Sequence, residues 1–242
     1  MIDIRATIAD VERSKPLPPG EDERFSGYGV MGLPFSSGHV LALRRFPVTS
    51  VGPGYTAVWL RRPSGSWVIY TDVAAEISCP RYFGSALEST SLHPIALEWT
   101  GGNTFTVTIG DGIGLVWEVE LGATLVTRMM SNVAGAVPDA MWHRKKFLKV
   151  MGAAAGPALG VGQLGLTGVV PNRQSFRASP KKVWSISGSR ATLAGQDLGT
   201  LEPLRVQSRL GDFWIPQRGI FMIGSSAFDR YDPSRHLPAA GR

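Results

Sequence analysis

The chain has 242 residues, of which 43% are hydrophobic and 18% charged, a composition that excludes an intrinsically disordered protein. Cys79 is the only cysteine, so an intrachain disulfide is excluded, and we expect a small buried or half-buried thiol rather than a catalytic thiolate. The first residues contain no apolar run of the kind found in secretory signals, and we expect a cytoplasmic protein.

Charge is distributed unevenly along the chain. Residues 1–127 carry 9 basic and 13 acidic side chains, residues 128–242 carry 16 basic and 6 acidic ones, and the net charge is +6. The basic C-terminal half favours an anionic partner, which is a small molecule, an anionic lipid surface or a nucleic acid. The alternative is a solvated basic surface with no partner.

The two ends of the chain are predicted to lie outside the main domain. Residues 1–27 are predicted as an extended N-terminal arm, because Lys15–Gly20 contains three prolines and cannot form a helix or a central strand. Residues 28–236 are predicted as a single β-rich domain, and residues 237–242 as a loose tail.

The first strand candidates are His39–Arg45 and a hairpin formed by Tyr55–Arg62 and Trp67–Thr71. Alternation along this hairpin puts large apolar side chains on both of its faces. One face carries Ala57, Trp59, Trp67 and Ile69, and the other carries Val58, Leu60, Val68 and Tyr70. This pattern predicts a strand pair covered on both sides, or the wall of a barrel with an apolar lumen.

Ile95–Trp99 leads into a second hairpin, whose strands are Asn103–Ile109 and Ile113–Leu121, with Gly110-Asp111-Gly112 as the turn. Pairing Ile109 with Ile113 places Phe105 opposite Trp117 and Thr104 opposite Glu118. Every apolar residue then lies on one face, and a slip by one residue would send each side chain to the wrong side.

A helix is predicted over Ala140–Met151, beginning near Pro138-Asp139 and ending at Gly152. A helical projection places its lysines on one arc, with Trp142 in the middle of that arc and apolar residues opposite. The remaining strand candidates are Thr124–Met130, Gln163–Val170, Val183–Ser187, Arg205–Arg209 and Ile220–Ile223.

These elements predict a mainly β fold, an antiparallel barrel or two-sheet sandwich with one packed α-helix around residues 139–151. The arrangement loosely resembles lipocalin-type barrels, in having many strands and one helix. No motif supports a family assignment.

Two glycine-rich features have structural interpretations. Gly160–Gly165 matches the dinucleotide fingerprint, but that motif needs a strand before it and a helix after it, and here the order is reversed. We interpret these glycines as allowing close packing, and no cofactor is predicted. Val150–Val170 contains 21 residues without a charge, yet its glycines and Pro157 make a poor helix, so no transmembrane segment is predicted.

Lys145 and Lys146 are adjacent, and repulsion between neighbouring ammonium groups lowers one pKa and favours a Schiff-base lysine. Acetoacetate decarboxylases use an adjacent lysine pair in this way and have a similar chain length, but the resemblance is restricted to these two residues. On an exposed helix solvent screens the repulsion, so a pair of charged surface lysines is the preferred interpretation.

Two further sets of polar residues are candidates for catalysis or metal binding. Glu118 and Glu120 share one strand face and are spaced like paired carboxylates, but the neighbouring threonines favour a solvent-facing sheet surface. If this face lined a cavity, the carboxylate interpretation would hold instead. The four histidines are scattered without metal-ligand spacing, so no metal site is predicted.

The loop from Ser208 to Gly219 concentrates two arginines, Asp212 and two aromatic residues. Either arginine can clamp an anionic ligand over an aromatic ring, and the alternative is an Arg–Asp pair that ties the loop to the barrel.

Together these patterns predict a pocket for a lipophilic small molecule with an anionic end, with enzymatic conversion as a further option and no catalytic residue assigned. The alternative is a basic protein that docks on an anionic membrane or on single-stranded nucleic acid, the nucleic acid being the less favoured partner. The candidate ligand-binding residues are Trp59, Trp67, Tyr70, Trp142, Lys145, Arg209, Asp212 and Arg218.

Overall fold

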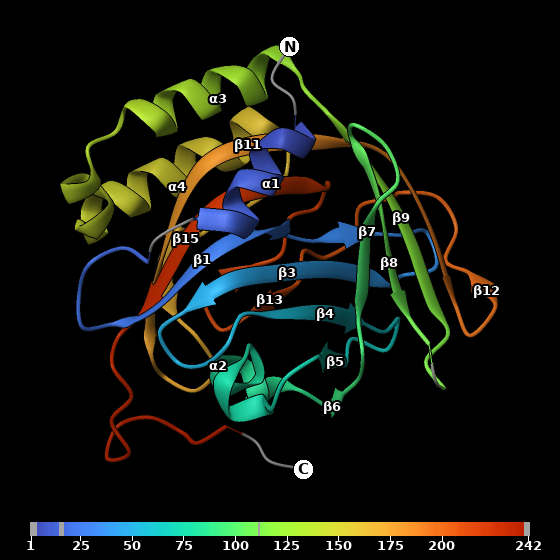
Figure 1. Cartoon of the computed structure of the whole chain (residues 1–242), viewed down its shortest axis with the longest axis horizontal. Helices are drawn as coiled ribbons and strands as arrows, with labels where there is room; N and C mark the ends of the chain where they lie inside the picture. Colours follow the sequence, from blue (N-terminus) through green and yellow to red (C-terminus); the bar gives the residue numbers. More distant parts are fainter. Residues whose placement is uncertain (1–3, 15–16, 111, 240–242) are drawn as a thin grey trace.

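A long, curled β-sheet dominates the fold (Figure 1). The computed structural model describes residues 4–14, 17–110 and 112–239. The chain is 40% strand and 22% helix, and the sheet forms a curled half-barrel, which confirms the predicted mainly β class. The strand order is β6-β5-β4-β3-β1-β15-β11-β9-β8-β7, and neighbouring strands on this path are antiparallel except for β5 and β6.

The bounds of the elements are as follows. The strands are β1 (Glu23–Val30), β2 (Leu33–Pro34), β3 (Val40–Thr49), β4 (Tyr55–Arg61), β5 (Trp67–Thr71), β6 (Ser89–Leu92), β7 (Ala96–Trp99), β8 (Thr104–Ile109), β9 (Leu115–Gly122), β10 (Thr167–Val169), β11 (Ser175–Leu193), β12 (Gln196–Asp197), β13 (Arg209–Leu210), β14 (Phe213–Trp214) and β15 (Ile220–Phe228). The helices are α1 (Ile4–Ser14), α2 (Pro80–Phe83), α3 (Leu125–Ala136) and α4 (Lys145–Leu159), with short 3-10 turns η1 (Ala75–Ile77), η2 (Gly84–Ala86) and η3 (Asp139–His143).

The ends of the sheet are drawn together by the chain itself. β6 and β7 lie at opposite ends of the strand order, but only residues 93–95 separate them in sequence. A link of this length spans roughly 10–14 Å, so the sheet has to curl until its two ends approach each other. Figure 1 shows β7, β8 and β9 running across the direction of β3, β4 and β5.

The hairpin β8–β9 has the predicted faces but a different register. Phe105 pairs with Val119 and Val107 with Trp117, so the strands are displaced by two residues from the predicted pairing. A two-residue shift leaves the faces unchanged because side chains alternate with a period of two. Gly112 and Gly114 have positive φ angles and extend the turn to residues 110–114, of which position 111 lies outside the described residues.

The sheet is covered on both faces, as the β4–β5 hairpin predicts. Val58 and Tyr70 belong to one hydrophobic cluster, whereas Trp59 and Trp67 belong to another. We call the first cluster the concave core, because it joins strands from the two ends of the curled sheet. The second cluster, on the opposite face of the same strands, is the convex core.

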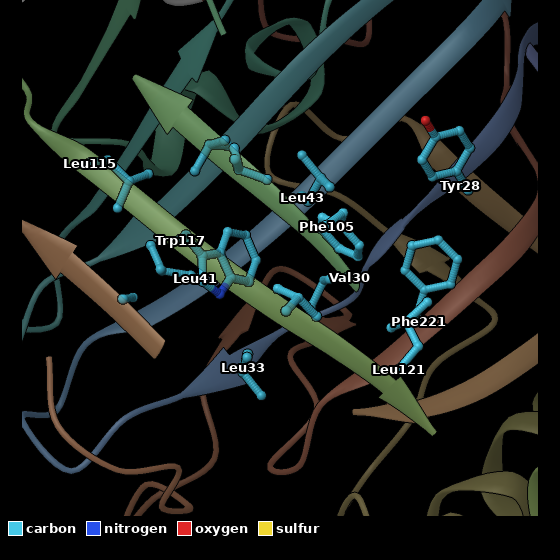
Figure 2. Packing of buried hydrophobic residues seen from close by; sticks show 14 of the residues in the cluster. Tyr28, Val30, Leu33, Leu41, Leu43, Phe105, Leu115, Trp117, Leu121 and Phe221 are labelled. Carbon is cyan, nitrogen blue, oxygen red and sulfur yellow. The ribbon is translucent and has the colours of Figure 1, made fainter. Parts of the chain in front are cut away.

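The concave core fills the interior of the half-barrel. Figure 2 shows Trp117 of β9 and Leu41 of β3 within it, although these strands are not neighbours in the sheet. α1 adds Ile4, Ile8 and Val11 to the same cluster. The interior is therefore occupied by side chains of the protein.

The extended conformation predicted for residues 1–27 is wrong for the first described stretch. Ile4–Ser14 form α1, and β1 begins at Glu23. α1 forms because its apolar residues recur at helical spacing and bury one face in the concave core. Residues 1–3 and 15–16 of this arm and residues 240–242 of the tail lie outside the described residues. The division into arm, domain and tail stays a prediction.

The predicted strand Thr124–Met130 is instead the beginning of α3. Thr124 Oγ1 accepts a hydrogen bond from the Thr127 amide at 3.1 Å, and Thr127 Oγ1 accepts one from the Thr124 amide at 2.9 Å. This capping box begins a helix in a sequence whose Val and Thr residues favour a strand.

The predicted helix over Ala140–Met151 is interrupted and longer than expected. η3 ends at His143, and Arg144 is extended. α4 then passes Gly152 and ends at Leu159, and the following C-cap residue Gly160 has φ of 65°. Because η3 is not continuous with α4, one helical projection does not describe both, and Trp142 is buried rather than part of the basic arc. Within the described ranges, no helix combines the length and the apolar character needed to cross a membrane.

The remaining strand predictions are largely confirmed. β3, β7, β11 and β15 include the segments predicted at His39–Arg45, Ile95–Trp99, Val183–Ser187 and Ile220–Ile223, apart from single terminal residues. Gln163–Val170 contributes only the short strand β10, and Arg205–Arg209 contributes only its last residue to β13.

Candidate ligand-binding site

The convex face of the sheet encloses a cavity of about 90 Å³. β1, β3, β4, β11 and β15 form its floor, and residues of α2 and β14 cover it. A space of this size has room for a compact ligand. We call this space the convex cavity.

Aromatic rings from four separate elements surround the convex cavity. Trp59 of β4 lies 4.5 Å from Phe83 of α2 and 5.9 Å from Phe213 of β14, measured between ring centroids. Phe176 of β11 lies 5.5 Å from Phe213. These rings give the cavity a mostly apolar lining, which favours the apolar part of a ligand.

Arg44 is the one charged side chain among the described residues of this lining, and it is only 5% exposed. Alternation along β3 puts Leu43 in the concave core and Arg44 on the opposite face. Its Nη1 donates to the carbonyls of Val30 at 2.6 Å and Leu43 at 2.9 Å, and its Nη2 donates to that of Met31 at 3.3 Å.

These three hydrogen bonds use only part of the guanidinium. Of its five N–H groups, the one on Nε and one on Nη2 have no acceptor among the described residues. Nε and Nη2 form one edge of the planar group. This edge has the geometry that binds a carboxylate through two parallel hydrogen bonds.

The charge of Arg44 has no ionised partner among the residues that the structure describes. Burial lowers the pKa of Arg44 to about 10, so the guanidinium is still charged at neutral pH. No carboxylate of the described residues lies within 4.0 Å of it. Its Cζ lies 4.8 Å from the Trp59 ring and 5.6 Å from the Phe213 ring, which offsets part of the cost of burying an unpaired cation.

Cys79 and Tyr55 form a neutral pair in the same lining. The Tyr55 hydroxyl and the Cys79 Sγ are 3.3 Å apart, and both residues are buried. Burial raises the pKa of the Cys79 thiol and that of the Tyr55 hydroxyl. Both groups are therefore protonated at neutral pH, so Cys79 is not an ionised nucleophile.

A carboxylate lies next to the cavity, but it is already paired with an arginine. Glu23 accepts hydrogen bonds from Arg81 at 2.6 and 3.0 Å, from the Tyr82 hydroxyl at 2.6 Å and from Gln174 Nε2 at 3.2 Å. Burial raises the pKa of Glu23, but these hydrogen bonds outweigh it, and the pKa is lowered. The Tyr82 ring stacks on Phe228 at 3.8 Å, and both rings line the cavity.

The predicted aromatic residues of the first hairpin are divided between the two faces of the sheet. Trp59 lines the convex cavity. Trp67 belongs to the convex core, and its ring centroid lies 6.5 Å from that of Trp59. Tyr70 points to the concave core and contacts His93. Only Trp59 of these three reaches the cavity.

The predicted helix residues lie elsewhere. Trp142 is buried beneath α3 and α4, where it packs on Phe147 and its ring lies 5.3 Å from Lys181 Nζ. Lys145 is exposed on α4 and lines an open groove together with Asp212. No described lysine lines the convex cavity, so Lys145 and Lys146 have the positions of surface residues.

The loop residues do not converge on one ligand site. Asp212 accepts a hydrogen bond from the Val169 amide at 2.9 Å, and Arg209 stacks on Trp214 at 5.2 Å. Arg218 lines a different surface depression. This loop reaches the cavity through Phe213, which packs against Trp59 and Arg44.

Arg44 itself is absent from the predicted site. The sequence does contain a pattern that indicates its burial. Val40, Ala42, Arg44 and Phe46 occupy alternate positions of a strand whose other face is also apolar. An arginine in such a row has to be buried with the apolar residues. Of the described residues, no group of three or more His, Cys, Asp or Glu side chains is placed to hold a metal ion.

Comparison with known proteins finds likeness only in structure. No protein-family model matches the chain, and no curated protein matches it in sequence. It is similar to acetoacetate decarboxylase from Legionella pneumophila subsp. pneumophila str. Philadelphia 1, at 13% identity, a TM-score of 0.43 and coverage of 95% of each chain. A second acetoacetate decarboxylase structure has 12% identity and a TM-score of 0.42, covering 95% of this chain and 96% of the other.

Proposed function

We propose that the convex cavity binds a small molecule that combines a carboxylate with a compact apolar body. The observation that supports this most directly is Arg44, a buried cation that lines an apolar cavity without a carboxylate partner among the described residues. A buried cation of this kind raises the free energy of the empty protein, and an anionic ligand would lower it.

In this proposal each part of the lining has a separate role. The Nε–Nη2 edge of Arg44 holds the carboxylate through two charge-assisted hydrogen bonds. The rings of Trp59, Phe176 and Phe213 enclose the apolar body.

Binding, rather than covalent conversion, is the function proposed. Cysteine and lysine act as covalent catalysts only as an ionised thiolate and a neutral amine. Burial raises the pKa of the Cys79 thiol, and no lysine belongs to the described lining. The lining therefore offers a charged anchor and an apolar enclosure.

The test is calorimetric titration with propionate and butyrate, compared with the uncharged propionamide. We expect the carboxylates to bind and the amide not to bind, because only the carboxylates neutralise Arg44. Arg44→Met removes the charge at similar length and is expected to weaken carboxylate binding at least about 30-fold. Above a pH of about 10, where Arg44 loses its proton, the carboxylate affinity of the wild type is expected to fall.

Arg61→Met is the matched control. Arg61 is a half-buried arginine of the neighbouring strand that also donates to carbonyl oxygens, but it does not line the cavity. Arg61→Met is expected to bind carboxylates like the wild type. Equal binding by Arg44→Met and the wild type would contradict the proposal, and so would equal losses in the two variants.

A further inference from the structure

α3 and α4 expose large apolar side chains to the surroundings. Leu125, Met129 and Val133 of α3 are 83%, 57% and 45% exposed, and Val150 of α4 is 68% exposed. The three residues of α3 recur every four positions, so they lie along one face of that helix. Isolated exposed apolar residues are ordinary, but a row of them along a helix marks a contact surface.

These side chains belong to one outer surface of the molecule. α3 and α4 are joined by η3 and pack against each other and against β11 (Figure 1). Ala134, Leu148 and Ala155 are buried on the inner side of the pair. We call the exposed residues of both helices from 125 to 150 the α3–α4 surface.

The α3–α4 surface is strongly basic. Its one acidic side chain, Asp139, forms an ion pair with Lys181 at 2.9 Å. Its lysines are exposed and make no ion pair with a described carboxylate. Its basic side chains are Arg128, Arg144, Lys145, Lys146 and Lys149.

We propose that the α3–α4 surface docks peripherally on an anionic lipid bilayer, a role separate from ligand binding in the convex cavity. The lysines and arginines match anionic headgroups, and the exposed side chains of Leu125, Met129 and Val150 enter the boundary between headgroups and acyl chains. A second copy of the chain would bring like charges together. A nucleic acid would match the charges but not the apolar row.

The test is cosedimentation of the whole protein with vesicles of phosphatidylcholine alone or mixed with phosphatidylserine. We expect binding to the mixed vesicles, weak binding to phosphatidylcholine, and loss of binding as salt is raised. Lys146→Gln with Lys149→Gln is expected to weaken binding roughly 30-fold, at about fivefold for each lysine. Leu125→Gln with Met129→Gln is expected to weaken it about tenfold.

Two matched control pairs lie away from this surface. Arg190→Gln with Arg205→Gln removes two exposed arginines, and Leu92→Gln with Val206→Gln replaces apolar side chains that are 65% and 77% exposed. Both control pairs are expected to bind the mixed vesicles like the wild type.

Three outcomes would overturn the proposal. The first is vesicle binding that does not support the surface. Such binding is absent, does not change with salt, or is weakened by the control pairs as much as by the double variants of the α3–α4 surface. Another is a concentration-dependent dimer that Leu125→Gln with Met129→Gln dissolves, which would assign the surface to a second copy. The last is binding of single-stranded DNA that depends on Lys146 and Lys149 while vesicles are not bound.

Discussion

At the scale of single residues, two buried charges have opposite surroundings. Glu23 is surrounded by side-chain donors from Arg81, Tyr82 and Gln174, which hold its carboxylate ionised. Arg44 donates only to main-chain carbonyls and keeps two N–H groups without an acceptor in the described residues. The first arrangement stabilises the fold, whereas the second leaves a charge available to a ligand.

Glu23→Gln is expected to destabilise the protein by about 2–4 kcal/mol at neutral pH, because it leaves Arg81 without its carboxylate. The folded pKa of Glu23 lies below the unfolded value of 4.5, so the folded state binds fewer protons in the acid range. The contribution is therefore complete above about pH 4.5 and is lost as the pH falls through the folded pKa.

Urea unfolding at a series of pH values checks this prediction, and the gap between Glu23→Gln and the wild type should shrink on acidification. The exposed Glu202→Gln serves as the control and should leave stability unchanged. A stability difference between Glu23→Gln and the wild type that stays constant at acid pH would contradict the role of the ionised carboxylate.

At the scale of elements, glycines determine how closely α4 approaches the segment that follows it. A Cβ on Gly156 would lie 2.2 Å from the carbonyl oxygen of Gly162, and one on Gly152 would lie 2.6 Å from that of Leu164. Gly152 and Gly156 therefore serve backbone packing. Within the Gly160–Gly165 motif, a Cβ on Gly165 would also approach a main-chain oxygen, that of Asp212 at 3.0 Å, whereas Gly160 and Gly162 have positive φ angles.

Gly156→Ala is expected to destabilise the protein by about 1–3 kcal/mol, because the methyl group has to displace a main-chain carbonyl. Gly135→Ala in α3 is the matched change, since a Cβ there meets no atom within 4 Å. It is expected to stabilise by about 0.5–1 kcal/mol through helix propensity. Thermal unfolding of both variants measures whether each change raises or lowers stability. Equal effects on stability would contradict the close approach of α4 to the main chain of Gly162.

Sequence patterns predict the strands of this protein better than its helices. The period-two alternation of Phe105, Val107 and Ile109 defines a face that tertiary packing then buries. It does not define the partner residue, because a shift of two positions preserves the faces. The strand predicted at Thr124–Met130 fails because a capping box, set by Thr124 and Thr127, acts more strongly than local strand propensity.

At the scale of the whole molecule, α1 covers part of the barrel interior. Glu12 of α1 accepts hydrogen bonds from Arg45 at 3.0 and 2.9 Å and from the Tyr28 hydroxyl at 2.7 Å. Its apolar face, which includes the 2% exposed Ile8, is part of the concave core. The N-terminal helix is thus held by both polar and apolar contacts.

Ile8→Ala is expected to lower the free energy of unfolding by about 2–4 kcal/mol, the usual cost of a cavity left by a buried aliphatic side chain. Arg5→Ala, at an exposed position of the same helix, is the control and should change stability little. Urea unfolding measures both. A loss below about 0.5 kcal/mol for Ile8→Ala would mean that α1 contributes little to the core.

The site is the part of the structure that sequence reasoning reaches least well. Arg44 and Phe213 meet in the convex cavity although 169 positions separate them, and no spacing rule connects β3 with β14. Trp59, chosen because its strand has two apolar faces, lines the cavity, and its part in ligand binding stays a prediction. Trp142 and Tyr70 are large aromatic residues of the same kind, but packing places them in other clusters.

The two-sided packing of β3 also has an evolutionary consequence. Leu41 and Leu43 belong to the barrel interior, while Ala42 and Arg44 belong to the opposite face. Substitutions at even positions can therefore change the cavity lining without altering the barrel interior, and odd positions can adapt without touching the cavity. Selection for binding and selection for folding would act on interleaved but separable sets of residues along the same strand.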